Sequence, residues 1–412
     1  MTEPRNPVDG ATVRAAGQRP LGVWALATAV IFFARAFMFS TWVSRGPEVK
    51  SLLGIDTLQL GLVTMLYPLG GLLAVGFSGP LVQRFGSRTV AFACYTTGAA
   101  SLALLGPAIT AGSIVAAAVL LVAFGAAMAI IDFVGNYEGT FVDRAAPRSI
   151  FSALHGAFGV GMLAGAAISG AVSGAGVPLG TQFIVIGVIT FALTAAASLS
   201  LPRHAKVVET DEQRAGQRRA NLAVWRERRS QTIALIGFSF ILAETAAGTW
   251  VPIALTKSGF DDATAAYALS ALWVAVTIGR LLGGFVVDAI GRFRTVLVSA
   301  LVTAAGLGVF MLADVVSLPW LGLALWGFGM AIGFPMSVAS MSDDPARSAA
   351  RINMIITIVY LAGITVGPAL GAVGQAFGIY VAFAIPLGLM LVSAVLSPAT
   401  RVSRSDQPQA AG

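Results

Sequence analysis

Long apolar stretches separated by short polar breaks recur along the whole chain. A helix that crosses a hydrocarbon layer of about 30 Å needs about 20 mostly apolar residues. The pattern predicts twelve spanning helices, at residues 22–44, 58–82, 88–107, 112–136, 150–173, 180–201, 231–255, 264–288, 294–313, 317–340, 351–373 and 378–398. No small-residue cleavage site follows the first stretch, which favours a retained spanning helix over a signal peptide.

Composition supports this interpretation. Of the 412 residues, 57% are hydrophobic and only 11% are charged, whereas a soluble domain carries roughly 25% charged residues. The chain is therefore expected to be an all-α membrane protein with the lipid bilayer around it. The single cysteine, Cys94, excludes a disulfide framework, and alone it suits neither a metal site nor a nucleophile.

The basic residues predict the orientation. With the N-terminus in the cytoplasm, 21 of the 26 Lys and Arg residues fall in cytoplasmic tails and loops. Three (Arg45, Lys50 and Lys257) fall outside, and Arg35 and Arg280 fall within helices. Cytoplasmic loops of membrane proteins are enriched in Lys and Arg. The net charge of +7 therefore indicates topology and contact with anionic lipid, not nucleic-acid binding.

The two halves of the chain resemble each other. STWV at 40–43 matches GTWV at 248–251, and GAAMAIIDF at 125–133 matches GFGMAIGFP at 327–335. GPLVQRFGSRTV at 79–90 matches GFVVDAIGRFRTV at 284–296, and the three offsets are 208, 202 and 205 residues. Such a repeat predicts two pseudo-symmetric bundles of six helices each.

The long basic connection between helices six and seven then sets the domain organisation. The expected parts are a cytoplasmic tail at 1–21, a first bundle at 22–201, a cytoplasmic central loop at 202–230, a second bundle at 231–398 and a cytoplasmic tail at 399–412.

The repeated loop after helices two and eight resembles the G-x-x-x-D-x-x-G-R-[KR] signature of the major facilitator superfamily of secondary transporters. The residues that carry the likeness are Gly79, Arg84, Gly86 and Arg88 in the first copy, and Gly284, Asp288, Gly291, Arg292 and Arg294 in the second. The first copy has Gln83 where the signature has an acid. The resemblance implies a gating role, with glycines that allow close packing and an acid that pairs with arginine. Arg280, four residues before Gly284, is grouped with this gating motif.

Within the superfamily the chain is similar to a branch of bacterial inner-membrane permeases distantly akin to fucose permease. That likeness rests on TWVSRGPEV at 41–49, NYEG at 136–139, LHGAFGVGMLAG at 154–165 and GFPMSVASMSDD at 333–344. It implies a monomeric carrier of the inner membrane that moves a small molecule by alternating access. No cofactor is expected, and a proton gradient would supply the driving force.

Asp132 is an acid within an apolar helix. It shares one helical face with Gly125, Met128, Asn136 and Gly139, at spacings of 3, 4, 4 and 3. A charge at the bilayer centre costs about 2.5–3.5 kcal/mol, so such residues usually face the protein interior and mark a pathway. Asp132 then carries a proton or contacts substrate, although a structural acid paired with a neighbouring helix fits the same pattern. The predicted boundaries place it in the cytoplasmic part of its helix.

Three more ionisable residues are candidates for the cavity. Glu244 lies near the midplane of the helix at 231–255, where it could carry a proton or act structurally. Arg35 suits either an anionic or hydroxylated substrate or the neutralisation of Asp132. His155 is one of only two histidines, and it could relay protons or serve as a structural histidine.

Phe39, Trp42 and Trp250 could stack on a substrate ring, but aromatic residues at such positions also serve as core or interfacial residues. Helix four has no intramembrane arginine, and helix five lacks the Gly-Pro pattern of drug antiporters. The sequence therefore favours solute–proton symport, with drug or metabolite efflux by antiport as the alternative. An intramembrane enzyme or a metal site would need a converging catalytic set or a cluster of ligands, and a sensor would need an output domain. The sequence offers none of these.

Overall fold

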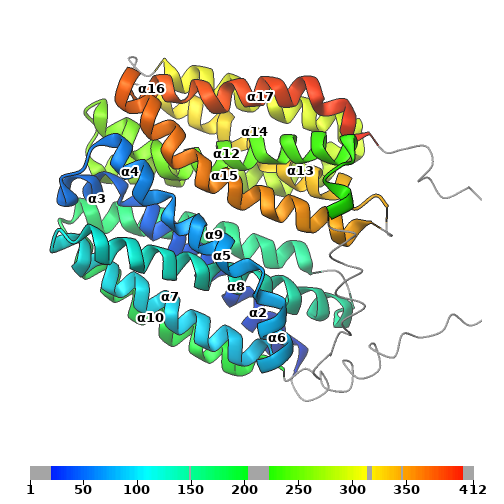
Figure 1. Cartoon of the computed structure of the whole chain (residues 1–412), viewed down its shortest axis with the longest axis horizontal. Coiled ribbons are helices and arrows are strands. Elements are labelled where there is room, and N and C mark those ends of the chain that lie inside the picture. Colours follow the sequence, from blue (N-terminus) through cyan, green and yellow to red (C-terminus); the bar gives the residue numbers. More distant parts are fainter. Residues whose placement is uncertain (1–19, 148–149, 203–221, 313–317, 345–346, 402–412) are drawn as a thin grey trace, which may run out of the picture. The chain divides into compact units, whose positions relative to one another are not determined.

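The computed structural model describes residues 20–147, 150–202, 222–312, 318–344 and 347–401. The described part is entirely helical and loop, with no strand (Figure 1). Residues 1–19 and 402–412 of the two expected tails, and residues 203–221 of the expected central loop, lie outside the described residues.

The first half of the chain contains nine helices in the described residues. They are α2 (Leu21–Ser44), α3 (Gly46–Leu53), α4 (Thr57–Thr64), α5 (Leu66–Val75), α6 (Ser78–Phe85), α7 (Ser87–Thr110), α8 (Ile114–Ala145), α9 (Phe151–Gly174) and α10 (Leu179–Ser200). A capping box at Asp56 and Gln59 starts α4, because each side chain accepts a hydrogen bond from the other's backbone amide.

The described second half contains six α-helices and a short 3-10 helix. They are α12 (Arg228–Lys257), α13 (Asp262–Met311), α14 (Leu318–Met341), α15 (Ser348–Phe377), α16 (Ile379–Ala382), α17 (Ala384–Leu396) and η1 (Ser397–Thr400). Although α13 is one continuous assignment of 50 residues, Gly291 in its middle has a non-helical backbone with φ of 77°. It therefore comprises two helices joined at a kink.

Eleven segments of the described residues are long and apolar enough to cross a membrane, and α13 is one of them. Division of α13 at Gly291 gives twelve spans, in agreement with the expected all-α membrane fold. One predicted boundary is wrong, because the stretch ending at residue 136 continues as helix α8 to Ala145. Its polar residues Asn136, Glu138 and Asp143 resemble a loop, but no proline or helix-ending glycine interrupts them before Pro147.

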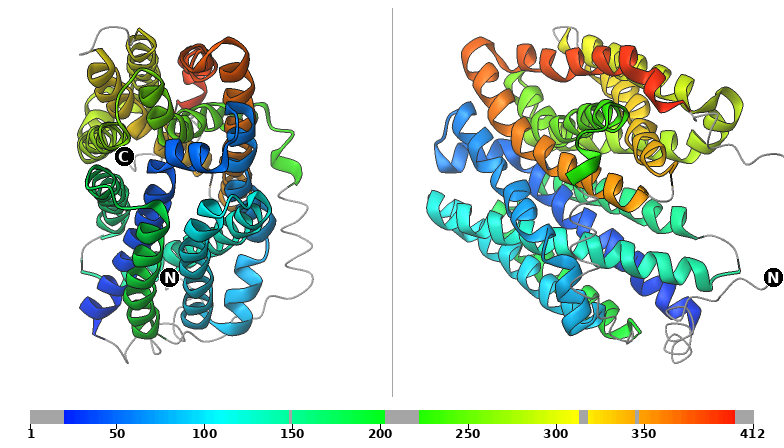
Figure 2. Two further views of the ribbon diagram at one scale, coloured as in Figure 1. Left: turned by 90° about the vertical axis from the view of Figure 1, so that its left-hand side faces the viewer. Right: turned by 45° about the vertical axis from the view of Figure 1, so that its right-hand side comes forward.

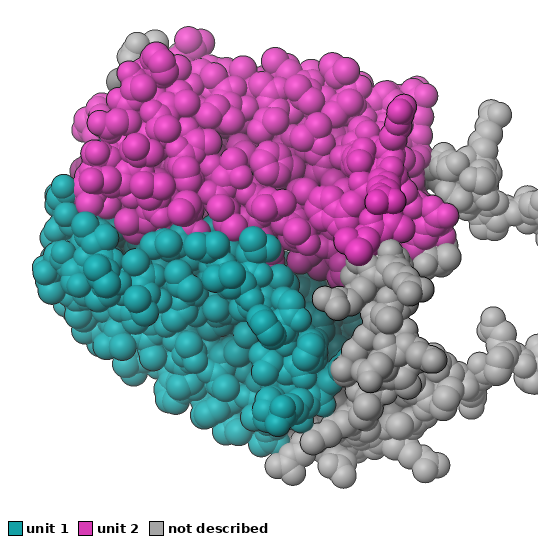
Figure 3. Space-filling view, viewed as in Figure 1, with its two compact units in different colours: residues 1–54, 66–209 teal, residues 55–65, 210–412 magenta. Residues whose placement is uncertain are grey.

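By internal contacts the chain divides into two compact units, coloured separately in Figure 3. Unit 1 comprises residues 1–54 and 66–209, and unit 2 comprises residues 55–65 and 210–412. Residues 55–65 thus group with unit 2, whereas the expected division places them in the first bundle. The reason is local, because α4 packs against α15 at Gly61 and Gly367. A Cβ atom on either glycine would collide with the carbonyl oxygen of the other.

Small residues also bring helices together within unit 1. A Cβ atom on Gly161 or Gly165 of α9 would collide with the backbone of α2 at Phe33 or Phe37. Helices α7 and α10 run alongside each other (Figures 1 and 2), and Gly106 and Gly180 lie at their contact. Close approach at small residues is typical of packed membrane helices, because lipid gives no hydrophobic driving force between them.

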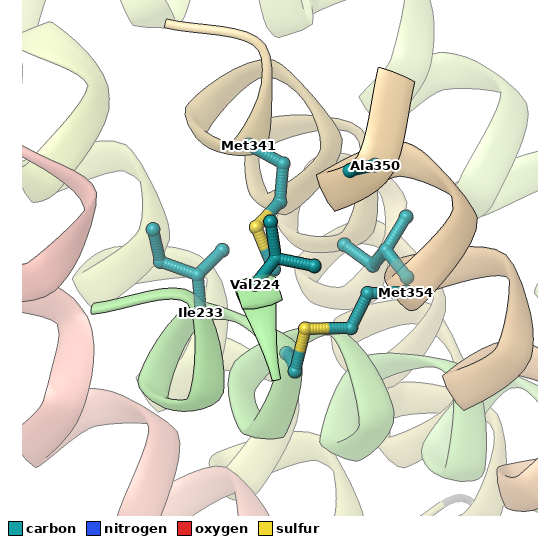
Figure 4. Close-up of a cluster of buried hydrophobic side chains, with 7 residues drawn as sticks. Val224, Ile233, Met341, Ala350 and Met354 are labelled. Atoms are coloured by element: carbon teal, nitrogen blue, oxygen red, sulfur yellow. The ribbon is translucent and has the colours of Figure 1, made fainter. Parts of the chain in front are cut away.

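In unit 2, a buried apolar cluster anchors the chain where it enters α12 (Figure 4). Val224, which precedes α12, is 2% exposed and packs with residues from α12, α14 and α15. The cluster consists of Val224, Ile233, Ala234, Met341, Ala350, Met354 and Ile355. Val224 therefore belongs to the core of unit 2, although the sequence places it in the central loop at 202–230.

Candidate functional site

Both copies of the signature place a glycine at a backbone turn. Gly86, between α6 and α7, has φ of 80°, and Gly291 in α13 has φ of 77°. Only glycine adopts this region without steric cost. The backbone conformation therefore explains why glycine stands at this position in both copies. The expected close packing at Gly79 and Gly284 is wrong. A Cβ atom on Gly284 would meet nothing within 4 Å, and one on Gly79 would meet only the Phe133 ring, at 3.8 Å.

The charged signature residues do not pair with each other in the described structure. Arg84 is exposed, with its guanidinium 5.2 Å from the Phe85 ring centroid, and Arg88 is half-buried. Asp288 is exposed. Arg292 instead donates to Asp343, just past the end of α14, at 2.6 Å. The signature arginine therefore bonds an acid outside the signature.

Asp343 is the centre of a small polar network at one end of unit 2. Its side chain is 7% exposed, and its second oxygen accepts from Arg229 at 2.8 Å. Arg229, near the start of α12, also donates to the carbonyl oxygens of Ala399 and Arg401. One acid thus ties the α13 kink to the start of α12 and, through Arg229, to the chain after α17.

Glu227 organises a second group beside this network. Its carboxylate accepts hydrogen bonds from Arg347 at 2.6 Å, from Arg351 at 2.9 Å and from Ser230 at 2.8 Å. Partial burial alone would raise the pKa of Glu227, but these three donors outweigh it and hold the pKa below its ordinary value. The carboxylate is therefore ionised at neutral pH.

The first charge pair within the spans joins α2 and α8. Arg35 Nη1 lies 3.1 Å from Asp132 Oδ1, and the two side chains are 23% and 39% exposed. Asp132 lies 18 residues after Ile114 and 13 before Ala145, in the C-terminal half of α8 but close to its middle. The pairing that the sequence left open between Arg35 and Asp132 is present.

Aromatic and polar groups surround this pair. The Arg35 guanidinium lies 5.2 Å from the ring centroid of Phe158 on α9. Tyr67 on α5 and Tyr95 on α7 are within electrostatic reach of both charges. The Asn136 amide donates to the backbone oxygen of Asp132, one helical turn back.

His155 is exposed, and its ring lies 4.7 Å from that of Phe32 on α2. It is thus on the α9 surface that faces α2, as Phe158 is.

The second mid-span pair joins α12 and α13. Arg280 Nη2 lies 3.2 Å and 3.4 Å from the two carboxylate oxygens of Glu244. Glu244 lies 16 residues after Arg228 and 13 before Lys257, near the middle of α12. The sequence grouped Arg280 with the gating motif, but the structure brings it to the acid of the neighbouring helix. Opposite charges at similar depth on consecutive spans were the signal for this pair.

The aromatic candidates differ in their exposure. Trp250 is 0% and Trp42 is 3% exposed, and Trp42 packs edge-on to Phe183. Phe39 is half-buried beside Tyr67, with ring centroids 5.0 Å apart. The burial of the two tryptophans fits the core interpretation, which leaves Phe39 as the candidate that is accessible.

A fully buried acid in unit 1 was not among the sequence candidates. Glu138 on α8 is 0% exposed, and its Oε2 accepts from the Trp24 indole nitrogen at 2.7 Å. The repeat has offsets of 208 residues in the first span and 202 residues in the fourth, so it gave no signal for this contact. Among the described residues no group of three or more His, Cys, Asp or Glu side chains is arranged to hold a metal ion.

Comparisons with known proteins agree on one family. The sequence profile described as Major Facilitator Superfamily matches residues 24–368. An uncharacterised MFS-type transporter from Yersinia pestis is 28% identical over 379 residues, which cover 91% of this chain and 96% of that protein.

Two solved structures share the fold at low sequence identity. A mutant of the nucleoside transporter NupG has a TM-score of 0.76 at 17% identity, over 92% of this chain and 99% of that one. A mutant of the E. coli fucose:proton symporter FucP has a TM-score of 0.65 at 16% identity, over 92% of this chain and 98% of that one.

Proposed function

Because the chain belongs to the major facilitator superfamily, we propose that this membrane transporter carries a small polar solute together with protons, by alternating access. Protons that move inward down their gradient drive the solute inward, and no cofactor takes part. The carrier is a monomer in the bacterial inner membrane, with both termini in the cytoplasm. The strong bias of Lys and Arg toward one set of loops supports this orientation.

The observation that carries the proposal is the ion pair between Arg35 and Asp132. It lies near the middle of two spanning helices, where an ionised carboxyl group is costly unless it is paired. A carboxyl group in such a place can exist as a paired anion or as a neutral acid, and proton uptake exchanges one state for the other. Each state gives Arg35 a different partner, which is what coupling between a proton and a solute requires.

Glu244 and Arg280 supply a comparable pair in unit 2. Glu244 is 18% exposed and Arg280 is 32% exposed, so neither group is sealed in the core. The proposal assigns Asp132 and Glu244 as proton carriers, and Arg35 and Arg280 as their charge partners. FucP, a fucose:proton symporter with the same fold, is consistent with proton coupling in this fold.

The test is transport by purified protein in proteoliposomes. Counterflow over a panel of sugars, nucleosides, small acids and drugs identifies a substrate, and an imposed pH gradient then measures its coupling. Asp132→Asn and Glu244→Gln remove one proton site each with little change in shape. We expect at least one variant to keep counterflow but lose accumulation driven by the pH gradient, by roughly tenfold or more. Normal proton dependence in both variants would refute the assignment. Solute accumulation driven by an outward-directed proton gradient would indicate antiport, the reaction of an efflux carrier.

A further inference from the structure

We infer that the Arg35–Asp132 pair binds the carboxylate of a small organic anion, and that the proton and the anion enter as a neutral combination. This inference rests on the proposed function and names its substrate class. The proton goes from water to Asp132 Oδ1, and the contact of this oxygen with Arg35 Nη1 breaks. The guanidinium then donates its hydrogen bonds to the substrate carboxylate.

The charge balance of the pair leads to this conclusion. In the structure the two charges cancel, at a separation of 3.1 Å. A proton on Asp132 alone would leave the Arg35 cation without its counterion in a medium of low dielectric constant, which is costly. An anion on Arg35 alone would leave the Asp132 carboxylate in the same position. When both bind, the net charge of the pair stays at zero, so each ligand strengthens the binding of the other.

A neutral solute gives no such mutual dependence at this pair. It can donate to Asp132 or accept from Arg35, but it replaces neither charge. The chemistry of arginine favours the anion too, because its planar guanidinium matches the two oxygens of a carboxylate. Phe158 lies beside the same guanidinium, at 5.2 Å, and offers apolar surface to the rest of a substrate molecule.

Charged and polar groups lie around Asp132 on five helices. On α2 the facing charge is Arg35, and on α8 itself the neighbours are Asn136 and Glu138, whose carboxylate accepts from Trp24. Tyr67 and Tyr95 face the pair from α5 and α7, and His155 lies on α9 against Phe32. Arg35 is the cation in direct contact with Asp132 among the described residues. Proton uptake by Asp132 therefore acts first on Arg35.

The test compares carboxylates with their uncharged counterparts on the purified full-length protein. The probes are lactate and lactamide, benzoate and benzamide, and gluconate and glucose, measured by thermal stabilisation at mildly acidic and mildly alkaline pH. At least one carboxylate is expected to bind about tenfold more tightly at the acidic pH, while its neutral counterpart does not bind. In proteoliposomes of Glu244→Gln, which leaves Asp132 as the one assigned proton carrier, uptake of this carboxylate should not respond to an imposed membrane potential.

Variants separate the roles of the two side chains. Asp132→Asn leaves Arg35 without a competing carboxylate, so the same probe should bind to similar extents at both pH values. Arg35→Lys keeps the charge but loses the planar fork, and its affinity should fall about tenfold with the pH dependence retained. The control is Asp56→Asn, which removes a carboxylate at the start of α4 but keeps the helix cap. It should bind as the unmodified protein does.

Several results would overturn the inference. They are a neutral probe that binds as tightly as its carboxylate, uptake by Glu244→Gln that carries net charge, or no response to any carboxylate in the panel. If a neutral solute is accumulated with protons, the substrate class is wrong while the proposed symport stands. If no solute is coupled to protons, the proposed function fails as well.

Discussion

Two pairs of opposite charges are in contact near the middle of the described spans. Arg35 faces Asp132, and Arg280 faces Glu244, each at about the mid-length of its helix. Pairing lowers the cost of holding a charge away from water, but the loss of one partner leaves the other exposed to that cost. At the residue scale, single substitutions at such pairs should therefore be more damaging than their contact areas suggest.

The same reasoning applies to Asp343, which is 7% exposed between Arg229 and Arg292. We expect Asp343→Asn to lower the free energy of unfolding by about 2 kcal/mol, because two arginines lose their shared anion. Asp344→Asn is the matched control. Its side chain is 35% exposed, and its contact with Arg347 is 3.7 Å long, so the expected loss is under about 0.5 kcal/mol. Denaturation of the detergent-purified variants measures both, and equal losses would contradict the central role of Asp343.

At the element scale, the kink in α13 separates two spanning helices. Gly291 forms it with φ of 77°, and Thr295, four residues on, donates to the Gly291 carbonyl oxygen at 2.9 Å. The second helix resumes directly after the turn, and Arg292 at its start donates to Asp343.

Gly291→Ala should lower the free energy of unfolding by about 1–2 kcal/mol, the cost of a left-handed backbone for a residue with a Cβ atom. Space is not the reason, because a Cβ atom there would meet nothing within 4 Å. Gly284→Ala, seven residues earlier in the same helix and equally open, should be neutral or stabilise by up to about 1 kcal/mol. If the two substitutions had the same effect, the kink would not depend on glycine conformation.

The sequence predicted the elements better than the contacts between them. Apolar length identifies the spans, since each helix must cross the same layer, and the repeated signature located Gly86 and Gly291. Helix α8 was predicted too short because Asn136 and Glu138 are polar, yet these residues are half-buried and buried in the helix. Arg280 was grouped with the gating motif by its position in the sequence, because the residue pattern along one helix does not show its contacts with a neighbouring helix. Its contact with Glu244 depends on how α13 is rotated against α12, which a single sequence does not fix.

At the scale of the whole molecule, the sequence repeat does not extend to the mid-span charges. By the offset of 208 residues that relates the first and seventh spans, Arg35 corresponds to Ala243. By the offset of 202 residues that relates the fourth and tenth spans, Asp132 corresponds to Phe334, and neither residue carries a charge. The mid-span charges therefore arose on different helices in each half.

The orientation of the whole chain gives a prediction of its own. In a Cys94→Ser background, Lys257→Cys should react with a membrane-impermeant maleimide in intact spheroplasts, whereas Ser405→Cys should react only after permeabilisation. The physical reason is the retention of Lys- and Arg-rich segments in the cytoplasm. The opposite labelling pattern would invert the assigned topology, and labelling of both sites in intact spheroplasts would exclude an odd number of spans between them.

The unequal location of the two mid-span ion pairs has a consequence for evolution of the carrier. The halves are no longer interchangeable copies, so a chimera built from two first halves would duplicate one charge couple and discard the other. Each acid meets its own set of neighbours and is free to acquire a distinct proton affinity. Gene duplication thus provided the frame, while separate mutations in each copy supplied its ionisable groups.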